Sequence, residues 1–170
     1  MRFPLFSGRW LIAPSLFLAV ASVHAQALPP GVRLGMSADE LRAALPDVER
    51  VQRPQRLAGG LSGNWRAPPS VLAGLLFETT FFFAGGDLQR VESVAALQAE
   101  SDRGAAAFAQ LLDWGRSSFG PEAGARDPGS AYASWVSGDT DIYLQHVDSP
   151  QRATVRLVYK ARQRKDGSAL

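Results

Sequence analysis

Apolar and polar residues alternate in two parts of the chain, and each pattern predicts an antiparallel hairpin. In the first part, residues 75–83 (LLFETTFFF) are rich in aromatic and β-branched side chains and predict the clearest strand. Gly85 and Gly86 can adopt the positive φ of a tight turn, and residues 88–97 predict the strand that returns.

The second hairpin is predicted from residues 141–147 and 153–159, with Asp148-Ser149-Pro150 as its turn. A short strand that contains a tryptophan precedes each hairpin, in residues 63–66 and in residues 132–136. Each half of the chain is therefore expected to contribute three antiparallel strands.

A helix is predicted before each set of strands. Ser37 and Glu40 form a capping box that begins the first helix, and Pro46 ends it. The second helix spans about residues 102–119, where apolar side chains return every three or four residues. These apolar positions are Phe108, Leu111, Leu112 and Phe119. Residues 47–62 are polar and rich in arginine, and predict a loop or a weak edge strand.

The order helix, short strand, hairpin thus occurs twice, in about residues 35–97 and 101–160. This repetition predicts an α+β fold in which two helix-plus-three-strand antiparallel units in tandem pack as one domain, residues 26–160. Residues 161–170 are rich in Lys and Arg and are predicted to form a flexible basic tail.

Residues 1–25 have the three parts of a secretory signal peptide. Arg2 and Arg9 give a positive start, an apolar stretch of about a dozen residues follows, and the chain then offers cleavage after Ala25 or Ala27. Because a membrane span needs ~20 apolar residues, we expect this leader to be cleaved rather than kept as an anchor. The sequence therefore predicts a periplasmic or secreted protein.

Composition excludes several classes of function. The chain has 18 Lys and Arg against 16 Asp and Glu, and the leader removes two arginines and no acid, which leaves a balanced mature chain of 145 residues. A balanced charge gives no broad surface for nucleic acid. The absence of cysteine excludes disulfides, thiolate metal sites, cysteine nucleophiles and a lipid anchor on an N-terminal cysteine.

Residues 35–41 (GMSADEL), followed by Leu45-Pro46, resemble the start of small exported tandem-repeat proteins. These include the β-lactamase inhibitory protein and the outer-membrane assembly lipoproteins of the SmpA/OmlA type. The resemblance implies a helical segment before antiparallel strands, and a sheet surface that contacts other proteins. The match is close over residues 35–46 and extends to the rest of the chain only by element order. The chain lacks the acylated cysteine of the lipoproteins, so their anchoring does not carry over, and no binding residue does either.

Residues that could perform catalysis are sparse. His146 is the one histidine of the mature chain, and strand alternation places it on an apolar face, as expected of a packed core residue. Asp139 and Asp141 lack the further oxygen ligands of a calcium loop. We therefore expect no enzymatic activity, no metal and no cofactor. A hydrolase that uses His146 with Asp148 or a serine is the least favoured alternative.

Strand alternation also yields a candidate binding surface. In the second hairpin it assigns to the core Ile142, Leu144, Val155, Leu157 and Tyr159. Tyr143 and Arg156 then project from neighbouring strands away from the helices, and Phe82 and Glu78 occupy the related place in the first hairpin. Aromatic residues and arginine beside small polar ones are typical of protein-binding patches, so these four are the candidate binding residues.

The function predicted from these patterns is that of an exported, non-enzymatic protein-interaction module, such as an envelope assembly factor or an inhibitor. Its expected partner is another envelope or secreted protein, with no role for nucleic acid and no stable membrane anchor. The main alternative is a small-ligand carrier with a cavity between the sheet and the helices. An exposed aromatic sheet face would favour the first function, and an enclosed apolar cavity the second.

Overall fold

The structure is a computed structural model that describes residues 28–97 and 102–162; the predicted leader and residues 163–170 lie outside the described residues. Its helices are α1 (Ala38–Ala44) and α2 (Ala105–Phe119), with a single 3₁₀ turn, η1 (Ala58–Gly60). Its strands are β1 (Glu49–Arg50), β2 (Ser62–Arg66), β3 (Ser70–Leu72), β4 (Leu75–Ala84), β5 (Asp87–Leu97), β6 (Ala123–Asp127), β7 (Ser130–Ser137), β8 (Thr140–Ser149) and β9 (Arg152–Ala161).

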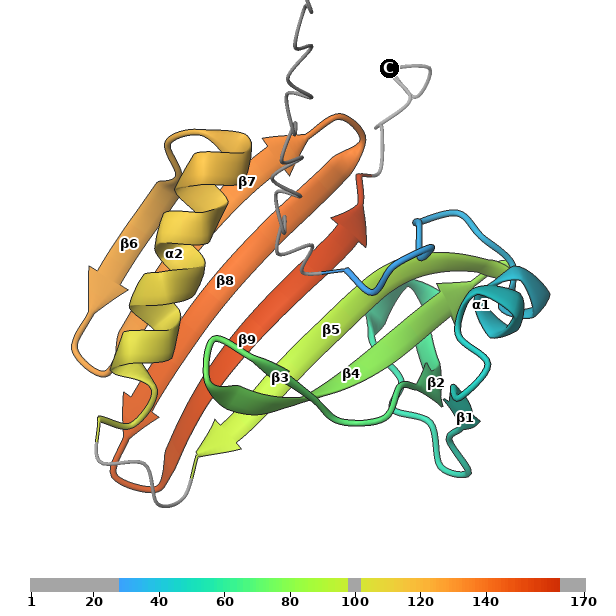
Figure 1. The fold of residues 1–170 in the computed structure, drawn as a ribbon, viewed down its shortest axis with the longest axis horizontal. Helices are drawn as coiled ribbons and strands as arrows, with labels where there is room; N and C mark the ends of the chain where they lie inside the picture. The colour runs from blue at the N-terminus through green and yellow to red at the C-terminus, as the bar shows by residue number, and fades with distance from the viewer. Residues whose placement is uncertain (1–27, 98–101, 163–170) are drawn as a thin grey trace, which may run out of the picture.

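All of these strands belong to one antiparallel sheet in the order β1-β2-β4-β5-β9-β8-β7-β6, and β3 pairs with the first residues of β4. The predicted α+β class is therefore confirmed. Figure 1 shows α2 lying across β7 and β8, with β6 beyond it at the edge of the sheet. The two long hairpins meet where β5 pairs with β9, from Arg90 opposite Lys160 to Leu97 opposite Ala153.

Both predicted hairpins are confirmed. β4 and β5 are joined by Gly85 and Gly86, whose φ angles of 63° and 96° are those that favour glycine. The register shifts by one residue between Phe82 and Phe83, where β4 departs from regular pairing. The second hairpin, β8 and β9, pairs without interruption from Thr140 opposite Ala161 to Ser149 opposite Arg152.

The capping box that begins α1 is also confirmed. The Ser37 hydroxyl accepts a hydrogen bond from the Glu40 amide at 3.3 Å, and the Glu40 carboxylate accepts one from the Ser37 amide at 2.7 Å. These bonds hold the pKa of Glu40 below its usual range, with the amide of Ser37 as the largest cause and Arg33 as the next. The helix ends at Ala44, and Leu41 is its one buried residue.

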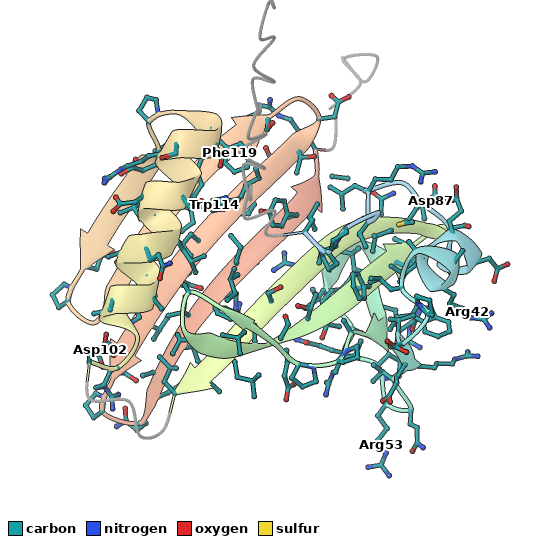
Figure 2. All side chains as sticks on the ribbon, viewed as in Figure 1. Arg42, Arg53, Asp87, Asp102, Trp114 and Phe119 are labelled. Carbon is teal, nitrogen blue, oxygen red and sulfur yellow. The ribbon has the colours of Figure 1, made fainter. Side chains whose placement is uncertain are left out.

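α2 begins three residues later than predicted. Arg103 and Gly104 have φ angles of 50° and 87°, which a right-handed α-helix does not accommodate, and the carboxylate of Asp102 accepts hydrogen bonds from the amides of Gly104 and Ala106 at 3.1 and 2.8 Å. In Figure 2, Asp102 lies at this end of α2, and Phe119 lies at the other. A methyl group at Gly115 would lie 2.4 Å from the Trp135 ring, so this glycine lets the helix approach the sheet closely.

Three strands were not predicted as such. β6 and β3 lie in segments for which the sequence predicted no strand. β1 is two residues long and lies in residues 47–62, where the prediction left a loop and a weak edge strand open. Small residues such as Ala123 and Gly124 have low strand propensity, so β6 depends on its pairing with β7.

One face of the sheet carries both helices. Leu41 of α1 belongs to the same buried apolar cluster as Phe108, Leu111 and Leu112 of α2. The residues that alternation assigned to the core of the second hairpin are all buried in this cluster, namely Ile142, Leu144, Val155, Leu157 and Tyr159. Neither helix packs on the opposite face.

Candidate functional site

The face of the sheet opposite the helices, here called the open face, is the candidate site. The strand pairings align its central residues in rows across the sheet: Phe82, Arg90, Lys160 and Asp141; Thr80, Glu92, Val158, Tyr143 and Ser134; and Glu78, Val94, Arg156, Gln145 and Tyr132. Phe82 and Val158 are buried, but they do not belong to the apolar cluster on the helix side. The two faces of the sheet therefore bury separate sets of apolar side chains.

An ionic cluster occupies the centre of the open face, where the two hairpins meet. Arg90 donates to one carboxylate oxygen of Glu92 through Nε at 3.1 Å and Nη2 at 2.9 Å. Nε of Arg156 lies 3.1 Å from the other oxygen, as an ion pair without the geometry of a hydrogen bond. The Glu92 side chain is only 9% exposed, so the two arginines compensate a carboxylate that is largely removed from water. The cluster keeps a net charge of +1.

Two tyrosines stack beside this cluster. The rings of Tyr132 and Tyr143 lie 6.1 Å apart with an angle of 27° between their planes. Burial raises the pKa of the Tyr143 hydroxyl, and the nearby Asp141 carboxylate adds to the effect. Tyr132 is 36% exposed, so the pair presents aromatic surface to solvent.

The structure brings together two of the four predicted binding residues. Tyr143 and Arg156 lie on adjacent strands of the open face in diagonal positions, because Tyr143 pairs with Val158 and Arg156 with Gln145. Glu78 lies on the same face, in the row of Arg156, and its carboxylate is 3.4 Å from Arg66.

The prediction that Phe82 contributes to an exposed patch is wrong. Its side chain is 1% exposed. A Cβ placed at Gly63 of β2 would lie 2.9 Å from the Phe82 ring, so the ring packs directly against a strand that has no side chain at that point. The glycine allows an aromatic residue to be buried on a face that carries no helix.

Three residues of the site were not predicted. Tyr132 is an odd number of positions from the buried Trp135, so alternation could have placed it on the open face. Arg90 and Glu92 also alternate with the buried Val91. Their neighbour Arg156, however, is supplied by the β5–β9 pairing, which no local pattern indicates.

His146 lies on the helix side of β8, as its alternation predicts. Its Nε2 is 2.8 Å from the carbonyl oxygen of Arg103, to which it donates, and its ring lies 5.7 Å from that of Phe108. The carboxylate of Asp148 pairs with the Arg103 guanidinium. Histidine and aspartate thus both hold the start of α2 against the sheet. Within residues 28–97 and 102–162, no three acidic, histidine or cysteine side chains gather as metal ligands.

A cleft of about 330 Å³ lies between α2 and the edge strands β6 and β7. Its lining includes Phe108 and Leu112 from the helix opposite Ala131 and Ala133 from β7. At its rim Arg116 donates to Glu122 through Nε at 2.8 Å and Nη2 at 2.5 Å. This pairing is the main cause that lowers the pKa of Glu122 to about 2.

Comparison of the chain with protein-family models, curated proteins and solved structures finds no match. The resemblance to exported tandem-repeat proteins therefore stays a prediction. No helix among the described residues is long and apolar enough to cross a membrane.

Proposed function

We propose that this chain is an exported, non-enzymatic module that binds another protein through its open face. The observation that carries the proposal is the stacked Tyr132–Tyr143 pair, which lies next to Arg156 on a sheet face to which neither helix packs. Tyrosine and arginine are among the residues enriched at the energetic centre of protein interfaces, because they combine a large contact area with polar groups. The expected partner is another envelope or secreted protein.

The tandem arrangement of two units is part of the same proposal. Two features support it: the strand order β2-β4-β5 in the first half is mirrored by β7-β8-β9 in the second, and each set follows a helix. The halves meet at β5 and β9, so the open face is continuous across both units.

The test is affinity capture from an envelope extract, with the wild type compared with a double variant. Tyr132→Ala with Tyr143→Ala should lose the captured partner while retaining a cooperative unfolding transition. A matched control carries Arg42→Ala and Gln110→Ala, two exposed positions on the helices, and should capture as the wild type does. If the same protein is retained equally by all three, the open face is not the binding surface.

A small-ligand carrier is the second candidate, favoured by the cleft between α2 and β7. Its small residues, Ala131 and Ala133, leave space below Phe108 and Leu112. Ala131→Leu should fill this space without touching the open face. If the protein releases a small molecule on denaturation and the variant does not, the carrier function replaces the first proposal.

A further inference from the structure

We infer that the centre of the open face binds a carboxylate side chain of an acidic segment in the partner protein. The inference rests on the proposed function, since it names the chemistry of the partner at the same face. It is carried by the charge of the Arg90–Glu92–Arg156 cluster and by the donors around it.

The cluster holds two cations and one anion. Because Glu92 accepts from Arg90 and pairs with Arg156, one positive charge stays without a counter-charge in the cluster. The arginine side chains are 21% and 32% exposed, while Glu92 is covered. An approaching group therefore meets guanidinium first and carboxylate only behind it.

Arg156 is oriented for a second carboxylate. Its contact with Glu92 is made through Nε, the nitrogen nearest the backbone, and among the described residues its Nη1 and Nη2 atoms have no acceptor. The two terminal nitrogens form the planar fork that matches a carboxylate with two parallel hydrogen bonds. Fixing Nε on Glu92 also restricts the side chain before binding, which reduces the entropy lost in the complex.

Neutral donors extend the site along the row of Arg156. Gln145 is paired directly with Arg156, and Tyr132 is paired with Gln145 on the next strand. Among the residues that the structure describes, the hydroxyls of Tyr132 and Tyr143 form no hydrogen bond. An acidic side chain seated on Arg156 would thus have amide and hydroxyl donors beside it.

The same charges favour a protein segment over a nucleic acid. Nucleic-acid binding relies on several phosphates, each neutralised by a lysine or arginine. Two other cations near this face already have a counter-charge, since Arg66 lies 3.4 Å from Glu78 and Arg162 lies 3.8 Å from Asp141. The single excess charge of the Arg90–Glu92–Arg156 cluster fits one carboxylate.

The test measures binding of a fluorescent oligoglutamate peptide to the purified protein by anisotropy at low salt. Arg156→Gln should weaken binding about tenfold or more, because a charge-assisted bidentate contact is lost. Arg156→Lys should recover only part of it, since lysine lacks the fork. Arg152→Gln, which removes the same charge four residues away on β9, is the control and should bind as the wild type does.

A second variant, which is expected to strengthen binding, keeps the test decisive if Arg156→Gln does not fold. Glu92→Gln removes the competing carboxylate and raises the charge of the cluster to +2, so it should bind oligoglutamate more tightly than the wild type. Equal binding by all variants, or equal binding of oligolysine or of a single-stranded oligodeoxynucleotide, would overturn the inference. If oligoglutamate binding fails while the tyrosine variant still loses its partner, the proposed function stands without this chemistry. If oligoglutamate binds as expected but the tyrosine variant still captures the partner, the carboxylate site stands and the proposed function does not.

Discussion

The two faces of the sheet bury large side chains in different ways. On the helix side, Phe81 is fully buried in an apolar cluster supplied by both helices, and the buried hydroxyls of Thr79 and Ser93 are joined by a hydrogen bond of 2.8 Å. On the open face, Phe82 is buried to the same extent with no helix above it, beside the charged group of Arg90 and Glu92.

This difference shows that burial alone does not separate core from surface in a single-layered sheet. Long arginine and tyrosine side chains can cover small and apolar neighbours while their own polar ends reach water. The open face is therefore partly dry without being a second apolar core.

The largest effects are expected at the two adjacent phenylalanines. Phe81→Ala should destabilise the protein by about 4 kcal/mol, because it leaves a cavity in the apolar cluster. Phe82→Ala should cost about 3 kcal/mol, since its ring packs against Gly63 and is removed from water to the same extent. Urea unfolding followed by circular dichroism measures both values. A cost below about 1 kcal/mol for Phe82→Ala would show that the open face behaves as ordinary surface.

The next effect concerns the carboxylate at the centre of the open face. Glu92→Ala should destabilise by about 2 kcal/mol, because Arg90 and Arg156 are left close together without their shared counter-charge. The loss stays below that of a fully buried pair because both arginines reach solvent. High salt should reduce it by screening their repulsion. Unchanged stability in Glu92→Ala would mean that the cluster is not held as the structure describes.

Much of each hairpin could be predicted from local pattern. Alternation in residues 75–83 and 141–147 identified the strands, the two glycines identified the first turn, and the Ser37–Glu40 box identified the start of α1. The same alternation placed Tyr143 and Arg156 on one face. These signals are local, because each depends on residues that lie close together in the sequence.

The remaining features depend on contacts between distant parts of the chain. Phe82 is buried because Gly63 of β2 pairs beside it, and a register shift follows it in β4. The ionic cluster exists because β5 pairs with β9, more than 60 residues later, which brings Glu92 to Arg156. Local pattern identifies which residues share a face of a strand, but not which strand lies next to it.

The third prediction uses pH to test the Arg116–Glu122 pair at the rim of the cleft beside α2. The pKa of Glu122 is lowered from 4.5 to about 2 by Arg116, so its pairing stabilises the folded state fully above about pH 4.5 and is lost as the pH falls toward 2. Glu122→Gln cannot titrate and should therefore lose less stability than the wild type between pH 4.5 and pH 2. Melting temperatures across this range measure the difference, with Glu49→Gln as an exposed control. Parallel curves for all three proteins would contradict the pairing.

The smallest effect is expected at Glu78, the second glutamate of the open face. Its side chain is 61% exposed, and its carboxylate lies 3.4 Å from an Arg66 that is itself half-exposed. Exposed ion pairs of this kind contribute less than about 0.5 kcal/mol, because water solvates both charges when they separate. The free energy of unfolding of Glu78→Ala, measured in urea, should thus lie within about 0.5 kcal/mol of the wild type, whereas that of Glu92→Ala should not.

Glu78 shares a row with Arg156, two strands away, so its removal should also leave oligoglutamate binding equal or slightly stronger. A stability loss as large as that of Glu92→Ala would mean that the two glutamates are equally buried, and the distinction between the centre and the margin of the open face would fail.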